Sequence, residues 1–250
     1  MSKSTLNVLI LAAGSNIAEP NSSPNAYPIC VTEIDGIPLL ERIVSSLSTV
    51  SPGDFHYCFL AEEVRRFHLD NLVQVLTPGA KIVNIQKGTK GSAATALMAI
   101  AAMDPESELL VVSANEWVKD NLTGFVREMR DRSLDAGTMI FHSVHPRYSY
   151  VRLDNFDLVT EAAQRNPISS HATTGVFWFK KTREVMSAIQ SMIRKGAEVE
   201  GGFYVAPALN EMLLKQARIG VMRIDAKNYH PIKDELQLSR LNLVHSDTSS

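Results

Sequence analysis

The chain has 250 residues, of which 45% are hydrophobic and 21% are charged, and its formal net charge is −2. This is an ordinary globular composition, and the small net charge provides no basic field that would attract nucleic acid or an anionic membrane surface. No apolar run approaches the roughly 20 residues of a membrane-spanning helix, and the first residues do not resemble a signal peptide with a cleavage site. We therefore expect a cytoplasmic protein that binds neither nucleic acid nor membrane.

The sequence contains two cysteines, Cys30 and Cys58. Their spacing matches no metal-binding motif, and a chain of this length needs no disulfide framework. We expect both to be reduced, partly buried thiols.

Candidate strands and helices alternate through the first half of the chain. The run "NVLILAA" is continuously apolar, which is typical of a strand covered on both faces. The segment "PLLERIVSSLSTV" places its leucines with Ile43 and Val44 on one helical stripe. Strands are predicted at residues 7–13, 55–61, 80–86, 108–115 and 136–144, and helices at 38–50, 62–76, 92–103 and 122–133.

After about residue 146 the order changes. Residues 149–164 predict two antiparallel strands around a turn at Asp154 and Asn155. We therefore predict one α/β domain over residues 1–244, with a mixed, mostly parallel sheet flanked by helices, and a flexible tail at 245–250. The remaining predicted elements are a strand at 172–181, helices at 182–196 and 205–216, and a last strand at 217–225.

Ligands of such sheets bind beyond the carboxyl ends of the strands, and three loops are expected to meet there. The first loop follows the first strand and contains Ala12, Ala13, Gly14 and Ser15. These small residues let the backbone amides approach a phosphate closely.

The other two loops carry more polar groups. Gly91 and Ser92 begin a predicted helix, whose free amides and dipole suit an anion or the edge of a base. Lys87 and Lys90 add positive charge beside it. Asn115 ends the fourth strand, where its oxygen could meet a Mg²⁺ held by phosphate oxygens.

The chain resembles the nucleotidyltransferase superfamily that makes nucleotide-sugars, whose fold is of the glycosyltransferase-A type. The resemblance extends over residues 7–241. "LILAAG" followed by "IDGIPLLERIV" resembles the family's opening, "TKGSAATAL" its base-recognition loop and helix, and "ELLVVSANEWV" the strand that ends at a metal ligand. The resemblance implies a nucleotide-binding part at about 5–145 and an acceptor-binding part at about 146–241.

The sequence departs from the family pattern at the places where phosphate charge is neutralised. The loop at 15–19 lacks the family's arginine, and Pro28-Ile29-Cys30 stands in place of a Pro-Lys-Pro unit. Asn115 replaces a metal-binding aspartate, Gln164-Arg165 replaces a Glu-Lys pair, and residues 230–236 replace the closing segment with its second metal aspartate. Removing one such cation commonly lowers a rate by about 10²–10³.

Because side chains alternate along a strand, Glu116 is expected to point away from the site if the strand continues past Asn115.

The resemblance also implies roles for individual residues. The implied catalytic residues are Lys90 and Arg165; the nucleotide-binding residues are Ala12, Ala13, Gly14, Ser15, Gln86, Gly91, Ser92 and Asn115; the acceptor-binding residues are Tyr150, Arg165, His171, Thr174, Gly175 and Tyr204; and the Mg²⁺ ligands are Asn115 and His230.

Two functions follow as hypotheses. The first is an enzyme that transfers a nucleotidyl group from CTP, UTP or dTTP to a sugar phosphate or similar acceptor, releases pyrophosphate, uses Mg²⁺ and serves surface-polysaccharide biosynthesis. The second is a catalytically degenerate relative that binds a nucleotide or nucleotide-sugar as a sensor or scaffold. A glycosyltransferase is disfavoured because no Asp-x-Asp motif follows the fourth strand. A homo-oligomer is left open.

Overall fold

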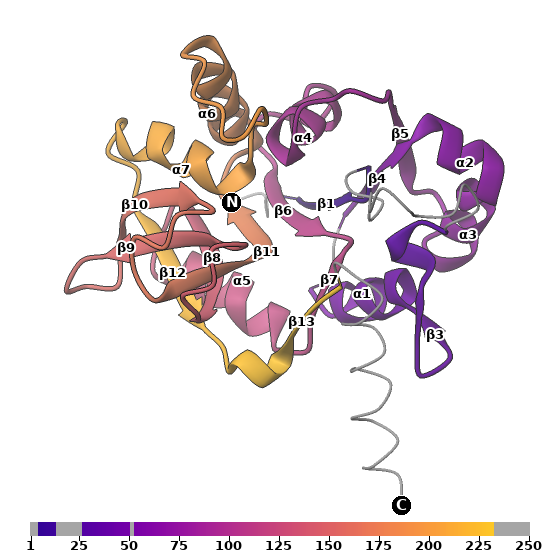
Figure 1. The fold of residues 1–250 in the computed structure, drawn as a ribbon, viewed down its shortest axis with the longest axis horizontal. Coiled ribbons are helices and arrows are strands. Elements are labelled where there is room, and N and C mark those ends of the chain that lie inside the picture. The colour runs from indigo at the N-terminus through magenta and orange to yellow at the C-terminus, as the bar shows by residue number, and fades with distance from the viewer. Residues whose placement is uncertain (1–4, 14–26, 51–52, 233–250) are drawn as a thin grey trace, which may run out of the picture.

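The structure, a computed structural model, describes residues 5–13, 27–50 and 53–232. A nine-stranded sheet lies at its centre, and helices cover both faces of the sheet (Figure 1). The helices are α1 (Leu39–Ser48), α2 (Ala61–Phe67), α3 (Leu69–Leu76), α4 (Ser92–Ile100), α5 (Leu122–Asp131), α6 (Thr182–Arg194) and α7 (Val205–Leu213), with short 3-10 turns at Ile29–Val31 and Ala226–Asn228. The strands are β1 (Leu6–Leu11), β2 (Glu33–Ile34), β3 (Ile37–Pro38), β4 (Phe55–Leu60), β5 (Lys81–Ile85), β6 (Glu108–Ser113), β7 (Glu116–Val118), β8 (Ala136–His142), β9 (Ser149–Leu153), β10 (Val159–Gln164), β11 (His171–Phe179), β12 (Ile219–Arg223) and β13 (Tyr229–Pro231).

The large sheet is mixed. Its strands follow the order β10-β9-β11-β6-β1-β4-β5, and β8 joins β11 to β12. The strands β1, β4, β5 and β6 pair in parallel, whereas β11 runs antiparallel to β6, β8 and β9, and β10 runs antiparallel to β9. Since β12 is parallel to β8, only β10 and β11 run against the other strands of this sheet. The predicted fold class is confirmed.

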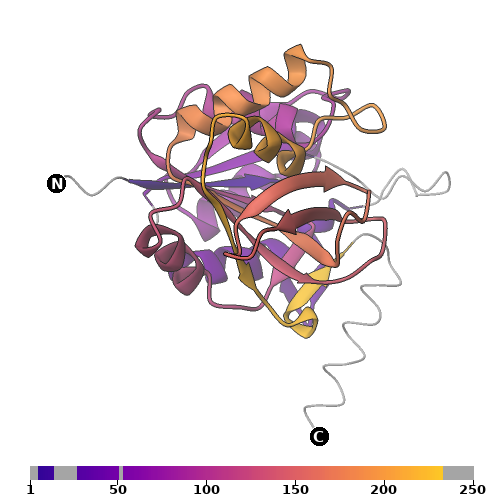
Figure 2. The same cartoon turned by 90° about the vertical axis from the view of Figure 1, so that its left-hand side faces the viewer.

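The two faces of the sheet carry separate hydrophobic cores. In β1, Val8 and Ile10 face the core formed with α1, α3 and α5, whereas Leu9 faces the core formed with α4, α6 and α7. Figure 2 shows these two groups of helices on opposite sides of the sheet. The continuous apolar run at 7–13 is therefore explained, because both faces of the strand are buried.

The structure differs from the predicted elements in a few places. The helix predicted at 62–76 is two helices, since His68 between α2 and α3 has a left-handed backbone with φ of 52°. The short strands β7 and β13, which pair with each other, were not predicted. As a result, the strand predicted at 217–225 is not the last one in the chain.

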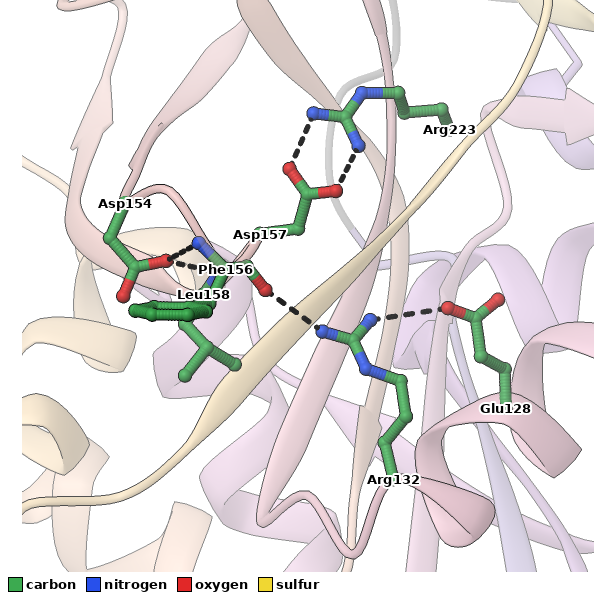
Figure 3. Close-up of polar contacts among 7 residues, drawn as sticks. All are labelled: Glu128, Arg132, Asp154, Phe156, Asp157, Leu158 and Arg223. Atoms are coloured by element: carbon green, nitrogen blue, oxygen red, sulfur yellow. Dashed lines mark hydrogen bonds and ion pairs between the residues drawn. The ribbon is translucent and has the colours of Figure 1, made fainter.

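The turn between β9 and β10 is tied to the rest of the domain by polar contacts (Figure 3). The Asp154 carboxylate accepts hydrogen bonds from the amides of Phe156, at 2.8 Å, and Leu158, at 2.9 Å. Two carboxylate oxygens of Asp157 accept from the guanidinium of Arg223, which ends β12. These contacts hold the hairpin against its neighbour and leave the ring of Phe156 exposed.

Among the described residues, no helix combines the length and the apolar character needed to cross a membrane.

Both cysteines are buried, with 3% of Cys30 and 0% of Cys58 exposed, and neither forms a disulfide. Burial raises the pKa of each thiol to about 12. We expect Ellman's reagent to leave both thiols unmodified in the native protein at pH 8 and to modify both in denaturant, because the thiolate is the reactive form. Rapid modification of either cysteine in the native protein would contradict this burial.

Candidate functional site

A cavity of about 550 Å³ lies at the carboxyl ends of the central strands. Leu11 of β1, Leu60 of β4 and Ser113 of β6 line it, and each stands at the last position of its strand. This volume is within the range of pockets that hold small-molecule ligands. The parallel strands therefore place the cavity where the sequence predicts a binding site.

Many of the predicted site residues line this cavity. They come from the loop after β1, the beginning of α4, the end of β6, the hairpin of β9 and β10, the middle of β11 and the segment before α7. They are Ala13, Gly91, Ser92, Asn115, Arg165, Thr174, Gly175 and Tyr204.

Six predicted residues do not line the cavity, and Gly14 and Ser15 lie outside the described residues. The amide of Ala12 donates to the Cys58 carbonyl, and the Gln86 carbonyl accepts from Thr89. The ammonium of Lys90 lies 3.9 Å from the carboxylate of Glu198. These three residues lie next to residues that line the cavity, but they do not line it themselves.

The other three residues make their contacts outside the cavity. Tyr150 is fully buried, and its hydroxyl donates to the carbonyl of His145. His171, the first residue of β11, pairs with His142, the last residue of β8. The ring of His230 stacks on Trp117, with 5.2 Å between ring centroids.

Glu116 lines the cavity, contrary to the sequence expectation. The chain turns at Ala114 and Asn115, and β7 begins at Glu116, so the alternation of β6 does not continue to this side chain. One oxygen of its carboxylate accepts hydrogen bonds from the amide of Gly175, at 3.0 Å, and from the hydroxyl of Tyr229. A β-carbon on Gly175 would lie 2.5 Å from Ser113, so this close approach requires glycine.

Tyr229 also lines the cavity, and only 6% of it is exposed. Burial, followed by the negative charge of Glu116, raises its pKa well above the ordinary value for tyrosine. The hydroxyl therefore stays protonated and donates to Glu116. No local sequence signal pointed to this pair, because β7 and β13 are more than a hundred residues apart in the chain.

Three cationic side chains line the cavity: Lys87, Arg147 and Arg165. The ammonium of Lys87 lies 2.7 Å from the carboxylate of Glu62, and the guanidinium of Arg165 is paired with Glu200. Arg147 was not predicted. Its guanidinium lies over the ring of Tyr148, 4.9 Å from the centroid.

The beginning of α4 forms part of the cavity wall and is held by the segment before α7. Gly91 has φ of 88° and precedes the first turn of the helix. The amide of Ala93 donates to the Phe203 carbonyl, at 2.9 Å, and the Phe203 amide donates to the Lys90 carbonyl, also at 2.9 Å. One of the helix amides expected to meet a ligand is therefore bonded within the chain.

The predicted Mg²⁺ ligands do not form a site of the expected kind. The side-chain amide oxygen Oδ1 of Asn115 accepts a hydrogen bond from the Ser113 hydroxyl, and His230 lies outside the cavity. Within the part of the chain that the structure describes, no group of three or more His, Cys, Asp or Glu side chains could hold a metal ion. Glu116 is the one carboxylate among the described lining residues, so these residues do not fit a metal held by the protein alone.

The fold has clear relatives among solved structures. The nucleoside-diphosphate-sugar pyrophosphorylase from Vibrio cholerae RC9 has a TM-score of 0.80 at 18% identity, covering 94% of this chain and 99% of its own. A protein described as a glucose-1-phosphate thymidylyltransferase from Bacillus anthracis, in complex with a sucrose, has a TM-score of 0.75 at 16% identity, covering 96% and 95%. The chain shares the fold of these two structures. A UDP-glucose pyrophosphorylase in complex with UDP-glucose has the same fold, with a TM-score of 0.76 at 13% identity over 98% and 99% of the two chains.

No protein-family model matches the sequence, and no curated protein matches it. These likenesses confirm the fold that the resemblance drawn from the sequence implies. At these identities the likeness establishes the fold, and the chemistry of the cavity has to be argued from its own residues.

Proposed function

We propose that this protein is a nucleotidyltransferase that joins a nucleotidyl group from CTP, UTP or dTTP to a sugar phosphate or similar acceptor, in the cytoplasm and in surface-polysaccharide biosynthesis. The supporting observation is the cavity itself. It lies in a nucleotidyltransferase fold at the beginning of a helix, and three cationic side chains line it. Such a site favours a ligand that carries phosphates.

In the proposed reaction, an oxygen of the acceptor phosphate attacks the α-phosphorus of the triphosphate. The bond between the α-phosphorus and the bridging oxygen breaks, and pyrophosphate leaves with that bond's electron pair. The protein's part is to position both ligands and to stabilise the charge on the phosphates. Arg165, which lines the cavity beside Gln164, is proposed to hold the acceptor phosphate.

The possible metal ligands bear on whether the proposed reaction needs Mg²⁺. Asn115 and His230 do not form a joint metal site, so no step is assigned to a metal held by them. A Mg²⁺ that entered with the triphosphate would find the carboxylate of Glu116 in the cavity wall. Parallel assays with Mg²⁺ and with EDTA separate a metal-dependent reaction from a metal-independent one.

A second function is favoured by one specific residue. Ile29 lines the cavity at the place where the resemblance expects the lysine of a Pro-Lys-Pro unit, and 8% of it is exposed. An apolar side chain there cannot stabilise charge on a triphosphate. This observation favours a degenerate relative that binds a nucleotide-sugar as a sensor or scaffold and does not turn it over.

The experiment measures pyrophosphate release with CTP, UTP, dTTP or ATP and a panel of sugar 1-phosphates. We expect release with one triphosphate, and an Arg165→Gln variant is expected to be slower by about 10²–10³ because it loses one phosphate-binding cation. Arg152→Gln is the matched control, since Arg152 lies on the same hairpin and pairs with Glu161 outside the cavity. No release across the panel, with calorimetric binding of a nucleotide-sugar, would support the sensor instead.

A further inference from the structure

Arg147 precedes β9 and is the third cationic side chain of the cavity wall. Its Nε atom is buried and has no hydrogen-bond partner among the described residues. A buried donor without a partner is unfavourable, and most buried polar groups in native proteins form hydrogen bonds with the protein or with ordered water. The position of this atom therefore points to a ligand that accepts hydrogen bonds.

The charge of Arg147 is also less neutralised than that of the other two cations. Lys87 is paired with Glu62, and Arg165 is paired with Glu200. No carboxylate lies within ion-pairing distance of Arg147 in residues 5–13, 27–50 and 53–232. An anion that enters the cavity thus meets one guanidinium that forms no ion pair with a described acid.

The guanidinium of Arg147 is held in place by its surroundings. It lies 4.9 Å from the centroid of the Tyr148 ring, a distance at which a cation is attracted to the face of an aromatic ring. The ring of Tyr148 packs in turn against Tyr229 and Phe141. Arg147 lies close enough to Tyr229 for its charge to oppose the rise in the pKa of that tyrosine. The side chain is therefore ordered before a ligand binds.

We propose that Arg147 binds a phosphate group of the ligand in this cavity. A guanidinium presents several N–H donors in a plane and binds phosphate oxygens through two parallel hydrogen bonds. The phosphate would satisfy the buried Nε atom and offset the charge. This inference rests on the proposed function, because it requires that the cavity take a phosphorylated ligand.

Calorimetric titration of the full-length protein tests the proposal. The wild type, Arg147→Gln, Arg147→Lys and the control Arg152→Gln are titrated with UDP-glucose, dTDP-glucose and CDP-glucose, and with the three parent nucleosides. For the nucleotide-sugar that the wild type binds best, we expect Arg147→Gln to raise the Kd about 10- to 100-fold and to leave the nucleoside affinity unchanged. Arg147→Lys keeps the charge without the planar donors, so we expect a smaller rise, and Arg152→Gln should match the wild type.

The outcomes separate this inference from the proposed function. Wild-type protein that binds none of the three nucleotide-sugars overturns the proposed function, and this inference with it. Binding by the wild type with an unchanged Kd in Arg147→Gln overturns the inference alone. An equal loss of nucleotide-sugar and nucleoside affinity also overturns it, since that pattern indicates a structural role. If Arg147→Gln does not fold by circular dichroism, Arg147→Lys carries the same comparison.

Discussion

Replacing Glu116 with alanine is expected to lower the free energy of unfolding by about 2–6 kcal/mol, because each of the two donors left without a partner costs about 1–3 kcal/mol. The carboxylate accepts from the amide of Gly175 and the hydroxyl of Tyr229. Tyr229 is buried, so water replaces the lost acceptor poorly. Urea-induced unfolding followed by circular dichroism measures the change.

Two variants give this measurement its controls. Glu116→Gln keeps an acceptor oxygen of similar shape, and we expect it to cost less than the alanine variant. Glu128→Ala removes a partly exposed carboxylate of α5 that pairs with Arg132, the residue after the helix, and we expect a change within about 0.5 kcal/mol of zero. Equal stabilities of Glu116→Ala and Glu128→Ala would show that the Glu116 contacts do not stabilise the fold.

Replacing Gly91 with alanine is expected to lower the free energy of unfolding by about 3–5 kcal/mol, through backbone strain and two weakened hydrogen bonds. With φ of 88° and ψ of 170°, Gly91 has a conformation that is essentially restricted to glycine. A β-carbon would also lie 2.3 Å from the carbonyl oxygen of Phe203 and 2.8 Å from its nitrogen. Both of those atoms are hydrogen-bonded to the loop around Gly91.

Gly88 provides the matched control for this variant. Its φ of 91° is similar, but a β-carbon there would meet no atom within 4 Å. Gly88→Ala is therefore expected to cost only about 1–2 kcal/mol of backbone strain. A Gly91→Ala variant as stable as Gly88→Ala would mean that Phe203 moves aside at no cost in stability. The close approach of Gly91 to Phe203 would then not be what requires glycine.

Much of the fold could be predicted because burial leaves a periodic pattern in the sequence. The stripe predicted at 38–50 is the buried face of α1, and the two-sided apolar run at 7–13 is β1. The break at His68 could not be predicted, since a left-handed conformation at a residue other than glycine depends on the packing of α2 and α3 and leaves no pattern in the sequence. The pairing of β7 with β13 was missed because both strands are short.

The cavity could be predicted in part, for a topological reason. Gly91, Ser92 and Asn115 follow parallel strands, and the carboxyl ends of such strands meet at one edge of the sheet. Glu116 and Arg147 also follow the carboxyl ends of strands, β6 and β8, but no local sequence pattern singled them out. Glu116 begins β7 after a sharp turn, and Arg147 lies in the connection between β8 and β9. Their directions depend on tertiary contacts that single-sequence patterns do not record.

The wall of the cavity joins residues from both ends of the described chain, and this has a consequence for biosynthesis. Ala13 follows β1, whereas Tyr229 comes from β13. The strand β13 pairs with β7, and the two lie side by side in both views (Figures 1 and 2). On the ribosome the chain emerges from its amino terminus. A nascent chain that stops before β13 has no Tyr229 to meet Glu116. A ligand that needs the complete pocket can therefore stabilise the protein only after β13 has been synthesised, and the earlier strands must assemble without its help.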